Sequence, residues 1–333
     1  MKIAIVGCGG MGNVHANSYL NIPGVTVVGV HDIISDLSEK LANLTGATVY
    51  DSYDAMLEQS GCDIVSVTLP SHLHMAFSIR AAEAGKHVIC EKPIALTLED
   101  ARVMIDVCQQ QNVHLFVGHV VRFFPEYNEM RNKIQDNSLG RIGVAHAKRI
   151  GAHPGTLRQW FIDDQLSGGV VIDLMVHDLD FMRWSIGEVR SVYGLRTVHG
   201  MVDYASATLV FDNDAVANIE SYWGYPGSFT TAAEIAGSKG LVQHDSSNNK
   251  SIKVVRTTTD VEKGPFVEVP QSPGYVSPYQ LELEHFIDCI RNGSEPIVSA
   301  EDAYKALEIG LAVMESVNTG QTVYLAKGGA HNE

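Results

Sequence analysis

The sequence predicts an α/β protein in which an N-terminal doubly wound parallel sheet is followed by an α+β domain with a large, mostly antiparallel open sheet. Over the first 120 residues, apolar strand patterns alternate with amphipathic helix patterns, which is typical of strand–helix–strand units. A glycine-rich turn joins the first strand to the first helix. Beyond residue 120, period-two alternation and short turns replace this rhythm. Because 333 residues exceed what one core usually serves, we expect one domain over residues 1–120 and another over 121–333.

The first domain is expected to contain six strands, each apolar along almost its whole length. They are residues 2–6, 25–31, 48–50, 63–68, 87–90 and 114–118. Continuous apolar strands are typical of a parallel sheet whose two faces are both covered by helices. Between the strands, Gly85 is placed to end one helix pattern and Thr97 to cap the start of another.

The second domain is expected to combine hairpins with three long helices. Strands are predicted at residues 143–152, 191–198, 204–211, 216–223 and 232–245, and helices at 169–185, 279–292 and 300–318. The turn "DNDA" between the third and fourth of these strands favours a hairpin. The last residues, 326–333, are expected to be frayed.

Composition excludes several classes of protein. Hydrophobic residues make up 45% of the chain and charged residues 19%, as in ordinary globular domains. A formal net charge of −15 without basic runs argues against binding to nucleic acid or to an anionic membrane. No apolar run reaches membrane-spanning length, and no secretory signal pattern opens the sequence. Five scattered cysteines without a C-x-x-C pair favour reduced thiols and a cytoplasmic location.

The stretch "IAIVGCGGMGNVHA" carries glycines in G-x-G-x-x-G spacing between a predicted strand and a predicted helix. In that context the first glycine permits a tight turn, the second lets the backbone approach a pyrophosphate, and the third lets helix and strand pack closely. The helix N-terminus then favours the phosphates. The alternative is a tight turn without a ligand. The expected cofactor-binding residues here are Gly7, Gly9, Gly10, Met11 and Gly12.

Asp32 ends the second predicted strand, twenty positions beyond the last of these glycines. A carboxylate at this place accepts hydrogen bonds from the adenosine ribose hydroxyls and would repel a 2′-phosphate. No Arg or Lys occurs among residues 33–39 to offset that charge. The sequence therefore predicts NAD in preference to NADP, with a cap for the next helix as the alternative role of Asp32.

A charged corner, "EKP", directly follows the fifth predicted strand in "KHVICEKPIA". In open α/β sheets, ligands bind beyond the carboxyl ends of the strands, so Glu91 and Lys92 are expected at the same edge as the glycines. A lysine there can stabilise a developing alkoxide or share a proton network with a substrate hydroxyl. The alternative is a surface ion pair, which would contribute only ~0–1 kcal/mol. Whether the bond before Pro93 is cis is left open. Residues after the fourth strand reach the same edge, and the cofactor residues expected there are Thr68, Pro70, His74, Glu91 and Lys92, with helix capping as the alternative for His74.

A second polar constellation lies in "SGGVVIDLMVHDLDFMRW". On an α-helix, Asp173 and His177 are one turn apart and can form a hydrogen bond, and Asp180 and Trp184 share their face. An imidazole supported by a carboxylate suits a general base. A surface Asp–His pair is the alternative, and no convincing third ligand supports a metal site, so no metal is expected.

Four motifs together resemble the glucose–fructose oxidoreductase, inositol dehydrogenase and MocA-like family over essentially the whole chain. They are "TLPSHLH", "AGKHVICEKPIALTLEDA", "GHVVRFFPEY" and "SGGVVIDLMVHDLDF". The resemblance implies a Rossmann domain that binds a nicotinamide dinucleotide and a C-terminal sheet domain that holds a sugar, cyclitol or related polyol. It also implies catalytic roles for Lys92, Asp173 and His177, and a homodimer or homotetramer formed through the C-terminal sheet.

The leading hypothesis is therefore an NAD-dependent transfer of hydride between a polyol carbon and nicotinamide. The alternatives are a non-catalytic NAD-sensing regulator on the same fold, and a reductase of an imine or of an aromatic diol or carbonyl compound. Further residues are weaker substrate candidates, because Arg122 can instead pair with an acid and Trp160 can instead pack. The full set of expected substrate residues is Lys92, His119, Arg122, Arg158, Trp160, Asp173, His177 and Tyr279.

Overall fold

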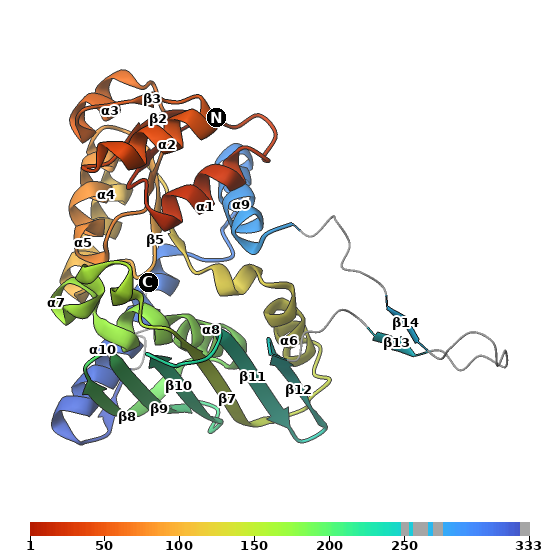
Figure 1. Cartoon of the computed structure of the whole chain (residues 1–333). Coiled ribbons are helices and arrows are strands. Elements are labelled where there is room, and N and C mark those ends of the chain that lie inside the picture. The colour runs from red at the N-terminus through yellow and green to blue at the C-terminus, as the bar shows by residue number, and fades with distance from the viewer. Residues whose placement is uncertain (248–252, 256–265, 269–275, 327–333) are drawn as a thin grey trace.

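The computed structural model describes residues 1–247, 253–255, 266–268 and 276–326. An N-terminal parallel sheet with its helices lies above a broad, curved C-terminal sheet (Figure 1). Most of residues 326–333, which the sequence predicts to be frayed, lie outside the described residues. The predicted fold class is confirmed in both of its parts.

All six strands predicted in the first domain form one parallel sheet in the order β3-β2-β1-β4-β5-β6. Apart from the two-residue edge strand β3, these strands carry mainly apolar, buried residues, because helices cover both faces of the sheet. The strands are β1 (Lys2–Val6), β2 (Thr26–His31), β3 (Thr48–Val49), β4 (Ile64–Val67), β5 (His87–Glu91) and β6 (Leu115–Gly118). The helices are α1 (Gly10–Tyr19), α2 (Ser35–Thr45), α3 (Tyr53–Gln59), α4 (His74–Glu83) and α5 (Leu98–Gln110), with a short turn η1 (Ser71–Leu73).

This strand order places a topological switch point between β1 and β4, where ligands of open α/β sheets bind. The loops after β1, β4, β5 and β6 all leave the sheet at its carboxyl edge. The predicted cap is also present, since the hydroxyl of Thr97 accepts a hydrogen bond from the N–H of Asp100 at 3.1 Å. The glycine loop and the charged corner therefore share one edge, as the sequence predicts.

The second sheet has seven strands in the order β12-β11-β7-β10-β9-β8-β15. Only β7 and β10 run parallel, so the sheet is mostly antiparallel as predicted. Its strands are β7 (Ile142–Gly151), β8 (Val189–His199), β9 (Val202–Phe211), β10 (Val216–Trp223), β11 (Thr230–Gly237), β12 (Gly240–Asp245) and β15 (Val323–Tyr324). Two further described strands, β13 (Lys253–Val255) and β14 (Phe266–Glu268), pair with each other.

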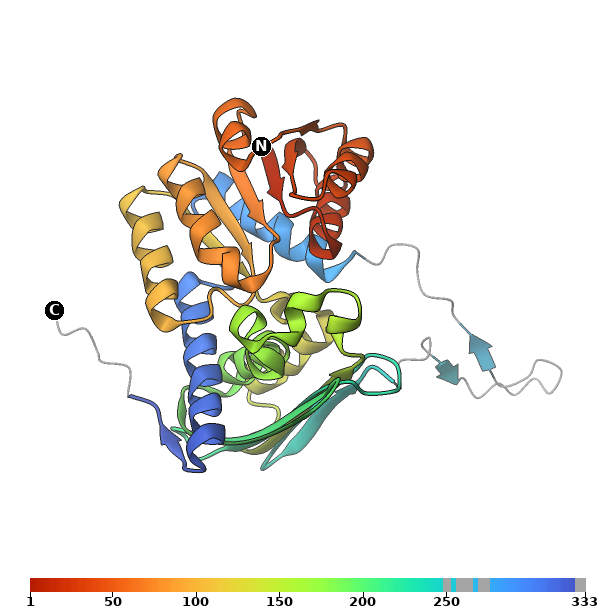
Figure 2. The same ribbon diagram turned by 60° about the vertical axis from the view of Figure 1, so that its left-hand side comes forward.

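Helices cover the face of this sheet that is turned toward the first domain (Figure 2). They include η2 (Val120–Phe123), α6 (Pro125–Gln135), α8 (Val176–Ile186) and α10 (Ala300–Thr319), together with the short turns η3 (Pro154–Thr156), η4 (Gln159–Ile162) and α7 (Asp164–Ser167). The helix predicted at 169–185 differs in one respect, because it begins with a π-helical turn, η5 (Val170–Met175). All six residues of η5 are buried, and this turn changes which side chains share a face.

The helix α9 (Pro278–Asn292) returns to the first domain and packs against α1 (Figure 1). Its Phe286 stacks on Phe116 of β6 with ring centroids 4.7 Å apart. Leu283, Phe286 and Ile287 belong to a hydrophobic cluster that also contains residues of β1 and β2. The division at residue 120 stays a prediction, and α9 joins the two predicted domains through a shared core.

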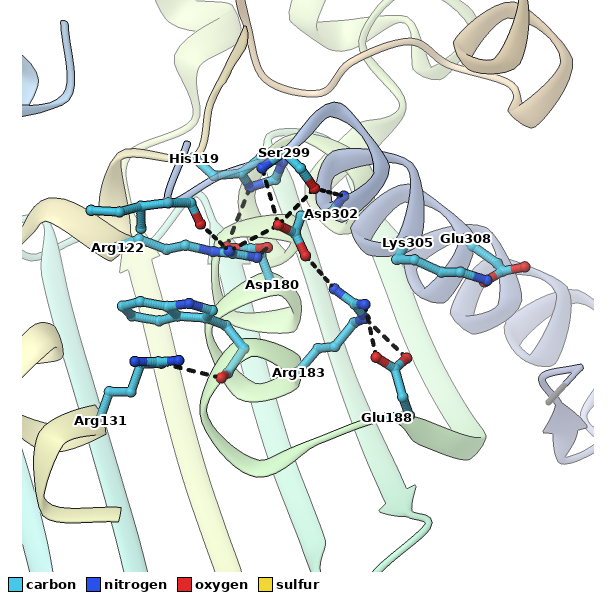
Figure 3. Close-up of polar contacts among 12 residues, drawn as sticks. His119, Arg122, Arg131, Asp180, Arg183, Glu188, Ser299, Asp302, Lys305 and Glu308 are labelled. Carbon is cyan, nitrogen blue, oxygen red and sulfur yellow. Dashed lines mark hydrogen bonds and ion pairs between the residues drawn. The ribbon is translucent and has the colours of Figure 1, made fainter. Parts of the chain in front are cut away.

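A buried ion network ties η2 to α8 and α10 within the second domain (Figure 3). Arg122 of η2 donates from Nε and Nη2 to the carboxylate of Asp180 on α8, at 2.9 and 2.6 Å. Its Nη1 contacts Asp302 of α10 at 3.2 Å, and Asp302 also accepts from Arg183 at 2.8 Å. Although burial opposes ionisation, Arg122, Arg183 and the helix-capping contacts with Ser299 hold the pKa of Asp302 below its ordinary value. Removing one partner of such a network leaves a buried charge, so the network fixes how η2, α8 and α10 pack against one another.

Two further properties bear on the setting of the protein. None of the described helices combines the length and the apolar character that a membrane span requires. All five cysteines are buried and free. A cytoplasmic location stays a prediction.

Candidate active site

The glycine loop has little room for side chains on its inner side. Gly7 has a φ of +90°, and a Cβ there would lie 2.6 Å from the carbonyl oxygen of Thr68. A Cβ on Gly12 would lie 2.2 Å from the carbonyl oxygen of Gly7, whereas a Cβ on Gly10 would meet nothing within 4 Å. The hydroxyl of Thr68 donates to the carbonyl oxygen of Gly7 at 2.6 Å and so supports the loop. The glycine loop, residues 7–12, therefore forms a dinucleotide cradle. Its side at Gly7 and Gly12 is closely packed, and its side at Gly10 and the partly exposed Met11 is open, which is the geometry a pyrophosphate requires.

Asp32 is fixed at the end of β2 by two backbone N–H groups. Its Oδ2 accepts from Cys8 at 2.7 Å and its Oδ1 accepts from Ile34 at 2.8 Å. The carboxylate therefore links the end of β2 to the glycine loop, and its remaining lone pairs are free to accept hydrogen bonds from ribose hydroxyls. Burial and the nearby Asp32 carboxylate raise the pKa of the Cys8 thiol to about 12, so this cysteine stays protonated and unreactive.

The loop after β4 braces the charged corner after β5. His74 is buried, with Nδ1 2.7 Å from the carbonyl oxygen of Pro93 and Nε2 2.9 Å from that of Leu69. The bond between Lys92 and Pro93 is cis. Pro70, which precedes η1, is half-buried. Because both imidazole nitrogens of His74 face backbone carbonyls, His74 positions the corner and does not point toward the open edge where a cofactor binds.

Glu91 also turns away from the open edge. Its Oε1 lies 2.9 Å from Nε2 of His15 on α1, and both side chains are almost fully buried. Burial opposes ionisation of Glu91, but the hydrogen bond and charge of His15 together with Lys92 lower its pKa below the ordinary value. Nδ1 of His15 lies 3.3 Å from the hydroxyl of Ser66 on β4. Sequence reasoning missed His15, although it lies about one helical turn beyond Gly12, the last glycine of the loop, with two residues between them.

Lys92 is the residue of this corner that enters the site. Its Nζ donates to the carbonyl oxygen of Asp173 at 2.8 Å and to Oδ1 of the same residue at 3.0 Å. The two side chains keep 14% and 13% of their surface exposed, so the pair is accessible at one side. An ammonium and a carboxylate from the two domains therefore meet at the carboxyl edge of the first sheet.

His177 lies at the start of α8 and does not make the predicted hydrogen bond with Asp173. Asp173 belongs to the π-helical turn and pairs with Lys92 instead, and Nδ1 of His177 has no partner among the described residues. Burial, followed by the charges of Lys92, Arg149 and His119, lowers the pKa of His177 well below 6.5. The imidazole is therefore neutral at physiological pH and able to accept a proton.

His119 is a second buried imidazole without a hydrogen-bond partner among the described residues. It follows β6 and is 1% exposed, and Oδ2 of Asp180 lies 3.8 Å from its Nδ1. Burial lowers its pKa, with Asp180 acting in the opposite direction and Arg122 and Lys92 reinforcing the shift. A neutral imidazole has one donor and one acceptor, which matches the hydrogen-bonding pattern of a hydroxyl group.

Two charged groups behind His177 were not identified as site residues from the sequence. Arg149 of β7 forms a bidentate pair with Asp178 of α8, with both contacts at 2.9 Å and both side chains buried. Tyr279, another of the expected substrate residues, lies in the first turn of α9. Burial, together with the charges of Glu91 and Glu282, raises the pKa of Tyr279 to about 12. Tyr279 therefore stays a neutral phenol. The sequence did offer one indication of the Arg149–Asp178 pair, because Arg149 is a charged residue at an inward-facing position of β7.

Three of the expected substrate residues lie apart from Lys92, Asp173, His177 and His119. Arg122 is 1% exposed and fully engaged in the ion network of η2, α8 and α10, so the alternative of pairing with an acid is the one observed (Figure 3). Trp160 is half-buried and stacks on Phe161 with centroids 3.7 Å apart. Arg158 is exposed and lies beside Gly9 of the glycine loop. Lys92, Asp173, His177 and His119 are thus the polar core of the site.

A metal centre finds no support in the part of the chain that the structure describes. Within those residues, no group of three His, Cys, Asp or Glu side chains is arranged to hold a metal ion.

A dinucleotide cradle and a polar pair contributed by two domains define a two-domain nicotinamide-dependent oxidoreductase. Family models agree: residues 1–119 match the NAD-binding Rossmann domain and residues 131–325 the C-terminal α/β domain of one oxidoreductase family. The chain therefore belongs to the glucose–fructose oxidoreductase, inositol dehydrogenase and MocA family.

Among its relatives, the chain is 30% identical to scyllo-inositol 2-dehydrogenase (NAD(+)) of Bacillus subtilis, over 98% of this chain and 96% of that protein. It is also 30% identical to myo-inositol 2-dehydrogenase of Thermotoga maritima, over 98% of both chains. The crystal structure of myo-inositol 2-dehydrogenase from Lactobacillus plantarum superposes with a TM-score of 0.84 at 24% identity, over 98% of this chain and 99% of that one. This structural match shows a shared fold.

Proposed function

We propose that this protein is an NAD-dependent dehydrogenase that oxidises a CH–OH group of an inositol or a related cyclic polyol or sugar. The observation that carries the proposal is the Lys92–Asp173 pair, whose lysine acts electrostatically on the neutral imidazole of His177 and leaves the sheet at the same edge as the glycine loop. The inositol dehydrogenases among the relatives support the substrate class.

The residues of the first domain fit the proposed cofactor. The glycine loop is open above Gly10, the N-terminus of α1 has no side-chain cap, and Asp32 presents a carboxylate at the ribose end. When bound, NAD supplies a hydride acceptor at the nicotinamide C4. The loop would hold the pyrophosphate through backbone N–H groups, and Asp32 would hold the adenosine ribose.

In the proposed reaction, His177 accepts the proton of the substrate hydroxyl while the hydride leaves the same carbon for the cofactor. The products are a carbonyl compound, NADH and protonated His177. Lys92 donates a hydrogen bond to the oxygen as negative charge develops on it. Asp173, held by Lys92, accepts a hydrogen bond from a second substrate hydroxyl, and in this proposal His119 binds another.

The test follows NADH absorbance while NAD is supplied with myo-inositol, scyllo-inositol, hexoses, pentoses, uronic acids and nucleotide sugars in turn. Reduction of NAD with an inositol or a monosaccharide is the expected result. Silence across the panel, with NAD binding retained in calorimetry, would contradict the dehydrogenase proposal and favour the NAD-sensing alternative.

Preference for NAD over NADP is a further part of the proposal. The test is a double variant, Asp32→Ser with Ile33→Arg, in which Ile33 is chosen because it is 95% exposed. The ratio of kcat/KM for NADP to kcat/KM for NAD should increase by about 10²-fold or more. The reason is that the variant removes a repulsive charge and the ribose hydrogen bonds, and adds a partner for the 2′-phosphate; each charged hydrogen bond contributes roughly 1.5–3 kcal/mol.

The matched control for this change is Ile33→Arg alone. It adds the same positive charge but keeps the carboxylate of Asp32, so NAD should remain the preferred cofactor. Equal use of NAD and NADP by the unmodified protein would contradict the assigned role of Asp32.

We also propose a homodimer or homotetramer formed through the outer face of the seven-stranded sheet. None of the described helices covers that face (Figure 2), and it carries exposed apolar side chains such as Tyr193, Leu195 and Val144. Light scattering that gives the mass of one chain at micromolar concentration would contradict this assembly.

A further inference from the structure

Arg158 belongs to the second domain but lies beside the glycine loop of the first. A Cβ placed on Gly9 would lie 3.6 Å from Nη2 of Arg158. Gly9 is the second glycine of the motif, the position at which the backbone approaches a pyrophosphate. The guanidinium of Arg158 therefore borders the space in which the phosphates bind.

The segment that carries Arg158, residues 152–168, is firmly attached to the second domain, and we call it the cap segment. Near its start, Nδ1 of His153 accepts a hydrogen bond from the N–H of Gly155 at 2.9 Å. The ring of His153 packs against Trp223 of β10. Asp164 forms an ion pair with Arg196 of β8 at 2.6 Å. Figure 2 shows the green helical turns of this region below the carboxyl edge of the first sheet, and α7 packs against η1 after β4.

Two positive potentials converge beside Gly9, and the nearby Asp32 carboxylate is held by the N–H groups of Cys8 and Ile34. Among the described residues, no carboxylate pairs with Arg158. The acids of its own segment are engaged elsewhere, since Asp163 accepts from the N–H of Gln165 at 2.8 Å and Asp164 pairs with Arg196. The N-terminus of α1 adds the positive end of its helix dipole at the same place. A cation held against a positive helix end is stabilised when an anion binds between them.

We propose that Arg158 binds the pyrophosphate of the dinucleotide, so that the second domain completes the cofactor site from above. This assignment replaces the substrate role expected from the sequence, because the guanidinium lies at the glycine loop and the Lys92–Asp173 pair has no contact with it. The α1 backbone holds the phosphates from one side and the planar guanidinium donates to the opposite oxygens. The inference rests on the dinucleotide half of the proposed function.

The test compares the binding of NAD, ADP-ribose and adenosine to the intact protein and to Arg158→Ala, by calorimetry and competition. We expect the Kd of NAD and of ADP-ribose to rise by about 10- to 100-fold, the range for a charge-assisted hydrogen bond. Adenosine lacks phosphate and should bind equally well to both proteins. Arg158→Lys should recover part of the affinity, since it restores the charge without the planar fork.

Arg141→Ala is the matched control, because Arg141 is an arginine with a side chain 77% exposed on the second domain. It removes the same charge and should leave all three affinities unchanged. ADP-ribose binding requires no turnover, so this test stands even where the dehydrogenase proposal fails. An unchanged Kd for ADP-ribose in Arg158→Ala would overturn the inference, and a raised KM for polyol with unchanged NAD affinity would return Arg158 to the substrate site.

Discussion

Replacing His177 with alanine should lower kcat for polyol oxidation by about 10²- to 10⁴-fold, the usual contribution of general base catalysis. The imidazole is buried and uncharged, and its Nδ1 has no partner among the described residues, so it is available to take the hydroxyl proton. Steady-state assays at saturating NAD measure the change. NAD binding, followed by calorimetry, should be retained because His177 lies outside the glycine loop.

The pH dependence of kcat/KM gives a separate readout of the same role. Burial and nearby positive charges lower the pKa of His177 well below 6.5, so the proton-accepting form persists to lower pH than for a free imidazole. The rate should therefore fall only as the pH drops through this lowered pKa, and the acid limb should be absent in His177→Ala. The exposed His199→Ala is the matched control and should keep both the rate and the limb. An unchanged kcat in His177→Ala would exclude His177 as the base.

Sequence reasoning succeeded where local pattern and chain geometry agree. The six strands of the first sheet and the positions of Gly7, Gly12 and Asp32 follow from alternation and spacing, because each requires only neighbours close in the chain. The shared edge of the glycine loop and Lys92 follows from the parallel arrangement alone. The fold and the approximate place of the site were therefore predictable.

The pairing of charges was less predictable, because it depends on contacts between distant segments. Asp173 was expected to support His177, yet the π-helical turn η5 directs it to Lys92, which lies 81 positions away in the chain. Nothing in the local pattern distinguishes a π-turn from an α-turn when all of its residues are buried. Glu91 and Arg122 show the same limit, since their partners His15 and Asp180 come from helices whose packing the sequence does not specify.

The contact between Lys92 and the distant Asp173 also bears on the effect expected from replacing Lys92. Replacing Lys92 with methionine keeps most of the side chain's volume and removes its charge, and kcat should fall by about 10²- to 10³-fold, the usual cost of losing one donor to a developing oxyanion. The Kd of NAD should change little, and the isotope effect with substrate deuterated at the reacting carbon should increase as hydride transfer becomes slower. The exposed Lys133→Met is the matched control and should leave all of these values unchanged.

Lys92 has two possible contributions, since it holds Asp173 through two hydrogen bonds and also faces the substrate oxygen in the proposed reaction. A double-mutant cycle with Asp173→Asn separates them. If Lys92 acted only by positioning Asp173, the double variant would be no slower than Asp173→Asn alone. We expect a further loss of at least about tenfold, because the alkoxide would still lack its donor. Retention of activity in Lys92→Met would refute the oxyanion role and would leave the charged corner as a structural brace between the domains.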